Sequence, residues 1–223
     1  PEDCHTLEEA VDWVHRGNRL TTIVLGEGEH RIDDEYLVIP SAMNIVGDPN
    51  VAKENIVVVG GIKFQFRSRS LSEWAEADIS KHWKRRQIQG YGHLQHMTLR
   101  QARSHGVSGE SSFTIEDVLV EQCGSSGVVV EGWKIVATCT NVEVRRCGRS
   151  GVVAMEHSKM ILTGDKTSVH HNCTKGDSDN YGLKIKNSSS HMTLCFPLTK
   201  ENVSIYNGGG GNWTNHNGLE NWI

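Results

Sequence analysis

The fold is decided by residues 93–102, which read HLQHMTLRQA, and by residues 114–123, which read TIEDVLVEQC. The second stretch matches the first at an offset of 21 residues, and every apolar position agrees. Further shifts of 24 and 25 residues take Val120 to Val144 and Val144 to Val169. A strand-like unit that recurs every 21 to 25 residues is typical of a solenoid, in which equivalent positions of successive turns stack.

Each unit contains an alternating strand, a small residue, a Gly-Val corner and a second short strand. Alternation directs the shared apolar positions inward, and the fixed pattern of leucine-rich repeats is missing. We therefore predict an all-β fold, a right-handed parallel β-helix of 21–25 residues per coil. The handedness follows the general rule for parallel crossovers.

Three segments depart from the repeat within what we treat as a single β-helix domain, residues 1–223. Residues 5–17 predict an amphipathic helix that begins at Thr6, ends at Gly17 and covers the open N-terminal end of the solenoid. Residues 66–88 predict a polar, partly helical insertion. Residues 208–223 predict a C-terminal tail.

Composition excludes several classes of protein. With 27 acidic and 23 basic residues, the formal net charge of −4 disfavours sequence-independent binding of nucleic acid. The cations between Lys81 and Arg86 are offset by nearby acidic residues, so a solvated helix explains them better than a nucleic-acid patch. No apolar run approaches the ~18 residues that a membrane span needs.

The outward side chains of the main strand predict two columns. The first contains Arg100, Glu121, Arg145, His170 and Tyr206, and the second contains Thr98, Leu119, Glu143, Ser168 and Ser204. With turns ~4.8 Å apart, Arg100, Glu121 and Arg145 would form an alternating-charge ladder. This ladder either solvates the sheet and blocks lateral pairing, or forms a groove for an anionic polysaccharide, with arginine forks and Tyr206 as a platform.

Residues 170–181 interrupt the repeat and predict a loop beside this groove. In a lyase or epimerase, His170 or Lys175 could be the base, and Asp177 with Asp179 could hold Ca²⁺. Two carboxylates are too few for calcium by themselves, so a solvated turn explains them better. Zinc at His170, His171 and Cys173 is disfavoured, because adjacent histidines on a strand point to opposite faces or into a corner and the spacing matches no structural zinc module.

Cysteines and glycosylation sequons leave the compartment open. Cys123 and Cys147 fall on equivalent inward positions after Ala102, which stacked small residues explain, although a disulfide between them is geometrically possible. Four Asn-x-Ser/Thr sequons begin at Asn172, Asn187, Asn202 and Asn212. They hint at secretion, but a tail rich in Asn and Ser creates such sequons by chance.

Residues 39–49 (IPSAMNIVGDP), 93–102 and 106–118 (GVSGESSFTIEDV) resemble the right-handed β-helix domain proteins predicted in large numbers in unicellular algae. More remotely, the architecture resembles the pectate-lyase-like superfamily, which contains polysaccharide lyases, epimerases and non-catalytic relatives. The resemblance implies the β-helix fold, and its implication for function rests on fold analogy alone.

Two functions follow as hypotheses. The favoured one is a non-catalytic β-helix module that presents its polar face and loops to a polysaccharide or protein partner. The alternative is a polysaccharide lyase or C5-epimerase acting on a uronate polymer. A module docked inside a larger assembly would need an extensive apolar outer face, for which the sequence offers Leu119 and Val129 and little more.

Overall fold

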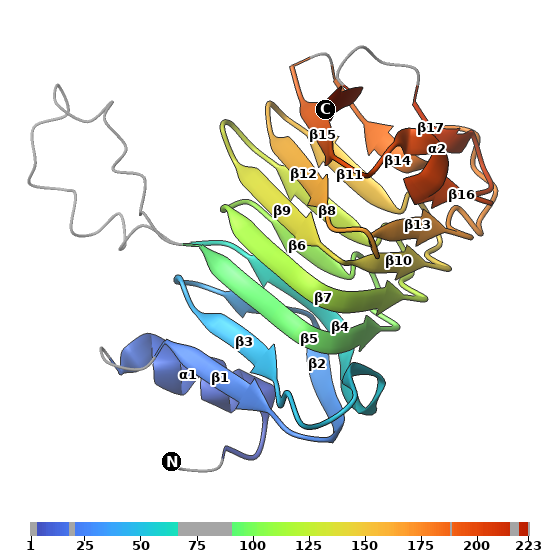
Figure 1. The fold of residues 1–223 in the computed structure, drawn as a ribbon. Helices are drawn as coiled ribbons and strands as arrows, with labels where there is room; N and C mark the ends of the chain where they lie inside the picture. Colours follow the sequence, from blue (N-terminus) through green and yellow to red (C-terminus); the bar gives the residue numbers. More distant parts are fainter. Residues whose placement is uncertain (1–3, 18–20, 67–90, 188, 215–218, 223) are drawn as a thin grey trace, which may run out of the picture.

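The computed structural model describes residues 4–17, 21–66, 91–187, 189–214 and 219–222. The strands in these ranges form one parallel, strongly curled sheet, through which the chain steps from the N-terminal to the C-terminal elements (Figure 1). The fold is therefore mostly β and a parallel β-helix-like solenoid, as the repeat predicts. Apart from Phe66, the predicted insertion 66–88 lies outside the described residues.

The strand pairings fall into three stacks. Stack 1 contains the first halves of β2 (Gly28–Ile39) and β4 (Ile56–Phe64), the second halves of β5 (Gly92–Arg100) and β7 (Phe113–Glu121), then β10 (Glu143–Arg145), β13 (Ser168–His170) and β16 (Ser204–Ile205). Stack 2 contains the second halves of β2 and β4, then β6 (Val107–Gly109), β8 (Val128–Glu131), β11 (Val152–Met155), β14 (Tyr181–Ile185) and β17 (Gly211–Trp213). Stack 3 contains β1 (Thr22–Leu25), β3 (Asn44–Gly47), the first halves of β5 and β7, β9 (Val136–Thr140), β12 (Lys159–Thr163), β15 (His191–Cys195) and β18 (Leu219–Trp222).

The register confirms the offsets that the sequence predicts. Leu99 pairs with Val120, Val120 with Val144, and Val144 with Val169. These side chains are buried, because alternation along each strand sends them into the space that the three stacks enclose. Like positions therefore stack on like through the middle of the core. The rings of Phe64 in stack 2 and Phe113 in stack 3 also pack against each other, nearly parallel, with centroids 5.1 Å apart.

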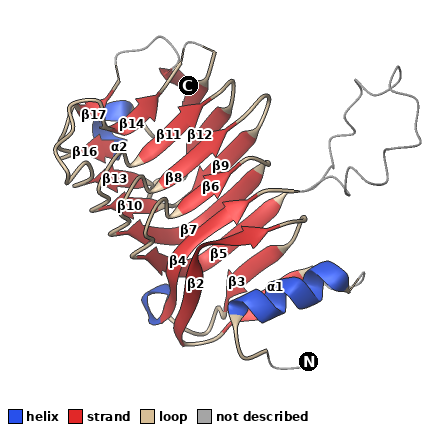
Figure 2. Cartoon of the chain, turned by 180° about the vertical axis from the view of Figure 1, so that it is seen from behind, coloured by secondary structure: helices blue, strands red, loops and turns tan. Residues whose placement is uncertain are grey.

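The predicted N-terminal helix is observed as α1 (Leu7–Arg16), which contacts β1 and β2 at the N-terminal end of the stacks (Figure 2). Thr6 is the N-cap residue, and its Oγ1 accepts from Glu9 N at 3.1 Å. Glu9 completes the arrangement by accepting from His5 N rather than from Thr6 N. The buried face of the helix is the apolar one that the sequence indicates, namely Leu7, Ala10, Val11 and Val14.

The C-terminal part differs from the sequence prediction in two ways. The predicted tail 208–223 continues the stacks, since β17 pairs with β14 and β18 pairs with β15. In β16, Ile205 pairs with His170 and Ser204 pairs with Val169, so the predicted columns slip by one residue there. The short helix α2 (Lys200–Val203) runs directly into β16, and a slip of one residue exchanges the two faces of a strand.

Candidate functional site

The outer face of stack 1 carries a connected row of polar side chains. The Arg145 guanidinium donates to Glu121 at 2.9 Å and to Glu143 at 2.8 Å. His170 Nε2 lies 3.1 Å from the same Glu143 oxygen, and His170 Nδ1 lies 2.8 Å from His171 Nδ1. We call Glu121, Arg145, Glu143, His170 and His171 the polar row. The charged groups of the polar row pair with one another, because carboxylates flank the Arg145 guanidinium on both sides.

Arg100 lies in register with Glu121, as predicted, but its ion pair is made elsewhere. The Arg100 guanidinium donates to Glu29 at 2.7 Å, and Arg31 donates to the other oxygen of Glu29 at 2.6 Å. The hydrogen bond from Arg100, with the nearby charge of Arg31, lowers the pKa of Glu29. The predicted ladder is therefore formed between Glu121 and Arg145, whereas Arg100 belongs to a cluster with β2.

Tyr206 does not continue the column of His170, because it occupies the next position along the chain. From β5 onward, the corner after stack 1 begins with a residue in the left-handed backbone conformation, with φ near 55° at Gln101, Gln122, Arg146, His171 and Tyr206. These five residues form a second column, which the sequence analysis missed. Within it, the rings of His171 and Tyr206 lie 5.5 Å apart, and Tyr206 is 74% exposed.

The position that follows each left-handed corner residue forms a further column, which contains the small residues that the sequence analysis expected to stack. Ala102, Cys123 and Cys147 are followed in the column by Asn172 and Asn207. Asn172 Oδ1 accepts from Cys147 N at 3.0 Å, and Asn172 Nδ2 donates to Val144 O at 2.9 Å. Asn207 repeats the pattern, accepting from Asn172 N and donating to Val169 O. This asparagine ladder satisfies backbone groups that would otherwise be unpaired inside the fold.

The loop predicted at residues 170–181 does not bring its charged side chains together. Asp177 accepts from Asn180 Nδ2 at 3.2 Å, whereas Asp179 pairs with Lys184 at 2.9 Å. That hydrogen bond from Lys184 lowers the pKa of Asp179. The predicted pair of calcium ligands therefore goes to different partners.

Lys175 extends over the corner of the preceding turn, where a Cβ on Gly148 would lie 3.0 Å from Lys175 Cε. His170 instead lies against Glu143, so the two predicted bases take different neighbours. In the part of the chain that the structure describes, no three His, Cys, Asp or Glu side chains gather so as to hold a metal ion.

Four of the six cysteines and the asparagine of one sequon lie in the core. All six cysteines are free thiols, and Cys123, Cys139, Cys147 and Cys173 are buried. Burial raises the pKa of Cys139 to about 12 and that of Cys173 to about 11. Asn172 is buried in the ladder, so its sequon is inaccessible in the folded chain.

The apolar outward residues do not form an open patch. Leu119 and Val129 are both buried. The 3-10 helix η1 (Lys53–Asn55) contacts β7, and Thr98 Oγ1 donates to Lys53 O at 3.0 Å beside Leu119. The segment before β4 thus covers part of the face that alternation alone assigns to solvent.

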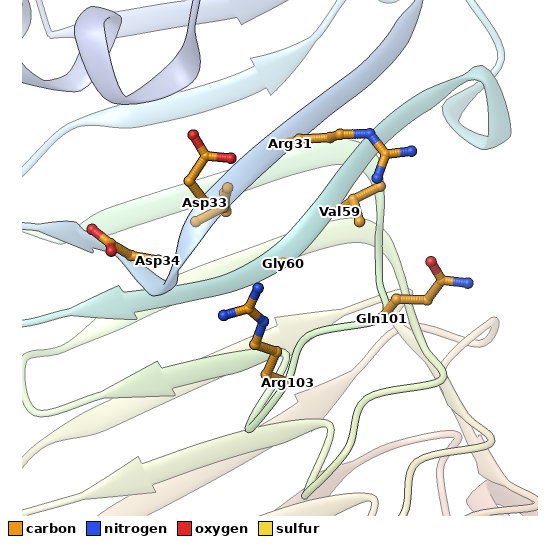
Figure 3. A pocket seen from close by; sticks show the side chains of 8 residues that line it. Arg31, Asp33, Asp34, Val59, Gly60, Gln101 and Arg103 are labelled. Atoms are coloured by element: carbon orange, nitrogen blue, oxygen red, sulfur yellow. The ribbon is translucent and has the colours of Figure 1, made fainter.

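A cavity of about 200 Å³ lies at the edge between stacks 1 and 2, and the sequence analysis missed it entirely (Figure 3). It is lined by Arg31, Ile32, Asp33, Asp34, Val59, Gly60, Gln101 and Arg103. The sequence feature that indicates the cavity is the difference in length between three successive corners. That difference can be recognised only once the strand register is known.

The fold and the polar row define a class, a β-helix-like solenoid with a polar strip along one face. No protein-family model, curated protein or solved structure matches this chain. Among the described residues, no helix is both long and apolar enough to cross a membrane.

Proposed function

We propose that this protein is a non-catalytic binding module that holds a polysaccharide chain along the outer face of stack 1. The observation that carries the proposal is the polar row with the exposed rings of His171 and Tyr206 at its end. Hydrogen-bonding groups that follow one another across successive turns suit a ligand that is itself a chain of repeating units.

The ring pair supports a sugar as the ligand. An aromatic ring offers a flat apolar face with polar groups at its edge, which matches the alternating C–H and O–H surface of a pyranose. The imidazole of His171 and the hydroxyl of Tyr206 add hydrogen-bonding groups beside that face.

A polysaccharide fits this face better than a protein partner does. Protein interfaces have an apolar centre with clustered aromatic anchors. Among the residues whose burial the structure describes, the exposed Trp, Tyr and Phe side chains are spread over different elements, namely Trp13, Tyr91, Trp133, Phe196 and Tyr206. The outward Leu119 and Val129 are covered, so they offer a protein partner no apolar centre.

We also propose the finer assignment of the fold, a right-handed β-helix with 21–25 residues per coil and α1 covering its N-terminal end. Parallel crossovers are almost always right-handed, which supports the handedness. The buried face of α1 against β1 and β2 supports the covering role. A remote relationship to the pectate-lyase-like superfamily remains part of this proposal and rests on architecture.

A lyase or epimerase is the second candidate, because His170 and Arg145 meet at one oxygen of Glu143. A base next to a guanidinium is the arrangement that proton abstraction beside a carboxylate requires. Against it, both groups are already engaged by Glu143, and Lys175, Asp177 and Asp179 make their contacts elsewhere.

The test is binding of pectate and alginate, measured by calorimetry, with Tyr206→Asn as the variant. Asn tolerates the left-handed backbone that Tyr206 adopts, so the substitution removes the ring without straining the corner. Phe196→Ala is the matched control, because Phe196 is equally exposed at 79% but lies at the end of stack 3. We expect a loss of affinity of about tenfold for Tyr206→Asn, which corresponds to about 1.4 kcal/mol and is the size of one specific aromatic contact.

Two results would count against the module. Equal binding by wild type and Tyr206→Asn would remove the ring pair from the proposed site. Release of unsaturated uronate by the wild type, with or without calcium, and its loss in His170→Asn would replace the module by the lyase.

A further inference from the structure

The cavity at the edge between stacks 1 and 2 has a simple origin in chain length. Between stack 1 and stack 2, the corner of β4 is Gly60 alone, because Val59 pairs with Arg31 and Arg100 while Gly61 already pairs with Tyr36. The turn before it uses residues 32–35 at this corner, and the turn after it uses residues 101–106. The short corner of β4 thus lies recessed between two longer ones, and we call this recess the notch.

The floor of the notch is bare backbone. Gly60 has a φ of 137°, which L side chains rarely adopt, and a Cβ there would lie 2.7 Å from Ile32 Cβ. Neighbouring strands are about 4.8 Å apart, so the two walls, one strand on each side of β4, are about 10 Å apart at the backbone. That width and a volume of about 200 Å³ suit one six-membered ring rather than a large ligand.

Two contacts across β4 close the ends of the notch. At the end near stack 1, Glu29 on β2 reaches Arg100 on β5, with 2.7 Å between the paired atoms. At the end near stack 2, Tyr36 lies over Gly61, and its hydroxyl oxygen accepts from His105 N at 3.0 Å. The notch is therefore framed on four sides by groups that are fixed before any ligand arrives, which lowers the entropic cost of binding.

The polar groups on the walls define the chemistry of a ligand. Arg31 and Gln101 lie toward one end of the opening, Asp33 and Asp34 lie toward the other, and Arg103 between them points to Gly60 (Figure 3). No hydrogen bond or ion pair joins the Arg103 guanidinium to another residue in the described ranges. A planar guanidinium binds a carboxylate through two parallel hydrogen bonds, and carboxylates and amides accept from hydroxyl groups.

We propose that the notch binds one carboxylate-bearing sugar unit, with the sugar carboxylate on Arg103 and its hydroxyl groups on Asp33, Asp34 and Gln101. This inference deepens the proposed function, because it names the acidic sugar of the polysaccharide. The notch lies on the edge beside the Arg100 end of stack 1, several turns from the Tyr206 ring.

Galacturonate as a monosaccharide, its methyl ester and an oligogalacturonate are the probes, observed through the backbone amide of Gly60 by NMR titration. We expect galacturonate to shift that amide, the uncharged methyl ester to shift it far less, and the oligomer to bind more tightly than the monosaccharide. Arg103→Ala should weaken galacturonate binding about tenfold or more, because the variant loses the charge-assisted hydrogen bonds to the sugar carboxylate.

Arg146→Asn is the matched control, because Arg146 is an exposed arginine on the same edge, two turns beyond Arg103, and Asn tolerates its left-handed backbone. Its effect on galacturonate binding should stay below about twofold, as expected for a charge outside the site. An unshifted Gly60 amide at millimolar galacturonate, or equal losses in the two arginine variants, would overturn the notch as a sugar site.

The two proposals fail separately. If Tyr206→Asn loses polymer binding but galacturonate leaves the Gly60 amide unshifted, stack 1 is supported as the binding face and the notch is refuted as a sugar site. If galacturonate shifts the Gly60 amide in a way that depends on Arg103, but Tyr206→Asn binds the polymer as the wild type does, the notch is supported and the Tyr206 platform is refuted.

Discussion

His96 and Asp117 occupy the same corner of two successive turns, and His96 Nδ1 lies 2.7 Å from Asp117 Oδ2. Both residues have the left-handed backbone conformation, with φ of 55° and 50°. His96 Nε2 lies 2.8 Å from Val51 O, and Asp117 Oδ1 accepts from Lys53 Nζ at 2.7 Å. This cluster ties the segment around η1 to the outer side of the strands.

The stability of the protein should fall as pH rises through the titration of His96. Both partners of its ring are acceptor oxygens, so both nitrogens donate, which requires the protonated ring. The hydrogen bond to Val51 O, followed by that to Asp117, raises the pKa of His96. Its contribution is therefore complete below the ordinary pKa of about 6.5 and is lost as pH rises through the higher folded pKa. Urea unfolding between pH 6 and 9 measures this, and His96→Asn should flatten the slope.

His105 should produce the opposite pH dependence. Its Nδ1 accepts from Ser126 N at 3.2 Å, so this nitrogen carries no proton. Burial, followed by the charge of Arg149, lowers the pKa of His105. The unfolded chain then binds a proton that the folded chain does not, and stability falls as pH drops below about 6.5. In urea unfolding carried to acidic pH, His105→Asn should no longer show this fall in the free energy of unfolding below about pH 6.5. An unchanged fall would contradict a buried, neutral His105.

Removing one member of the asparagine ladder should be costly. Asn172→Ala leaves Cys147 N–H and Val144 C=O without their partners inside the fold. We expect a loss of about 2–4 kcal/mol in the free energy of unfolding, from two unsatisfied buried groups. Asn55→Ala, at an exposed position whose amide reaches Glu27, is the control and should cost less than about 1 kcal/mol. Similar losses in both variants would refute the ladder's role.

The ring of Phe113 and the glycine beside it should be energetically coupled. A Cβ on Gly109 would lie 2.2 Å from Phe113 Cε1, and Phe113 stacks on Phe64. Phe113→Ala should cost about 3–5 kcal/mol, and Gly109→Ala should also destabilise because nothing else can give way. The double variant should cost less than the sum, since the added methyl group enters the space that the ring vacates. Strict additivity in thermal or urea unfolding would contradict this packing.

Alkylation of the thiols should separate the cysteines by burial. With the pKa of Cys139 at about 12 and that of Cys173 at about 11, neither thiol ionises at pH 8, and both are buried. Cys4 is exposed and should react first. Iodoacetamide labelling followed by peptide mass spectrometry should show Cys4 modified in the folded chain and Cys139 and Cys173 modified only in urea. Early labelling of Cys139 would contradict the core.

The repeat predicted the register well in the middle of the chain and failed near its end. Where apolar residues alternate without interruption, only one pairing buries them all, so Val120, Val144 and Val169 were placed correctly. Before β16, α2 and its loop remove that constraint. The pattern could not tell Ile205 from Tyr206 as the neighbour of His170, because the length of an intervening segment does not reveal the residue at which the strand begins.

The candidate site was predicted in part for a similar reason. Arg145, Glu121 and His170 come from adjacent copies of the repeat, and the structure brings them together through Glu143. The ion partner of Arg100 is Glu29, on a strand 71 residues earlier whose copy of the repeat is too weak to align. The predicted loop residues separated because Lys184 and Asn180 hold the two aspartates locally.

By itself, the sequence determined which side chains of the middle strands face inward, how those strands are paired, and where α1 begins and ends. Those properties depend on contacts between neighbours in the chain and on the burial of periodically spaced apolar residues. Both can be recognised within one or two copies of the repeat. Only the tertiary structure decided the notch, the ladder of Asn172 and Asn207, and the burial of Leu119. These three features depend on which corners lie side by side and on how far each corner projects beyond its neighbour. Such an arrangement involves several turns of the solenoid at once.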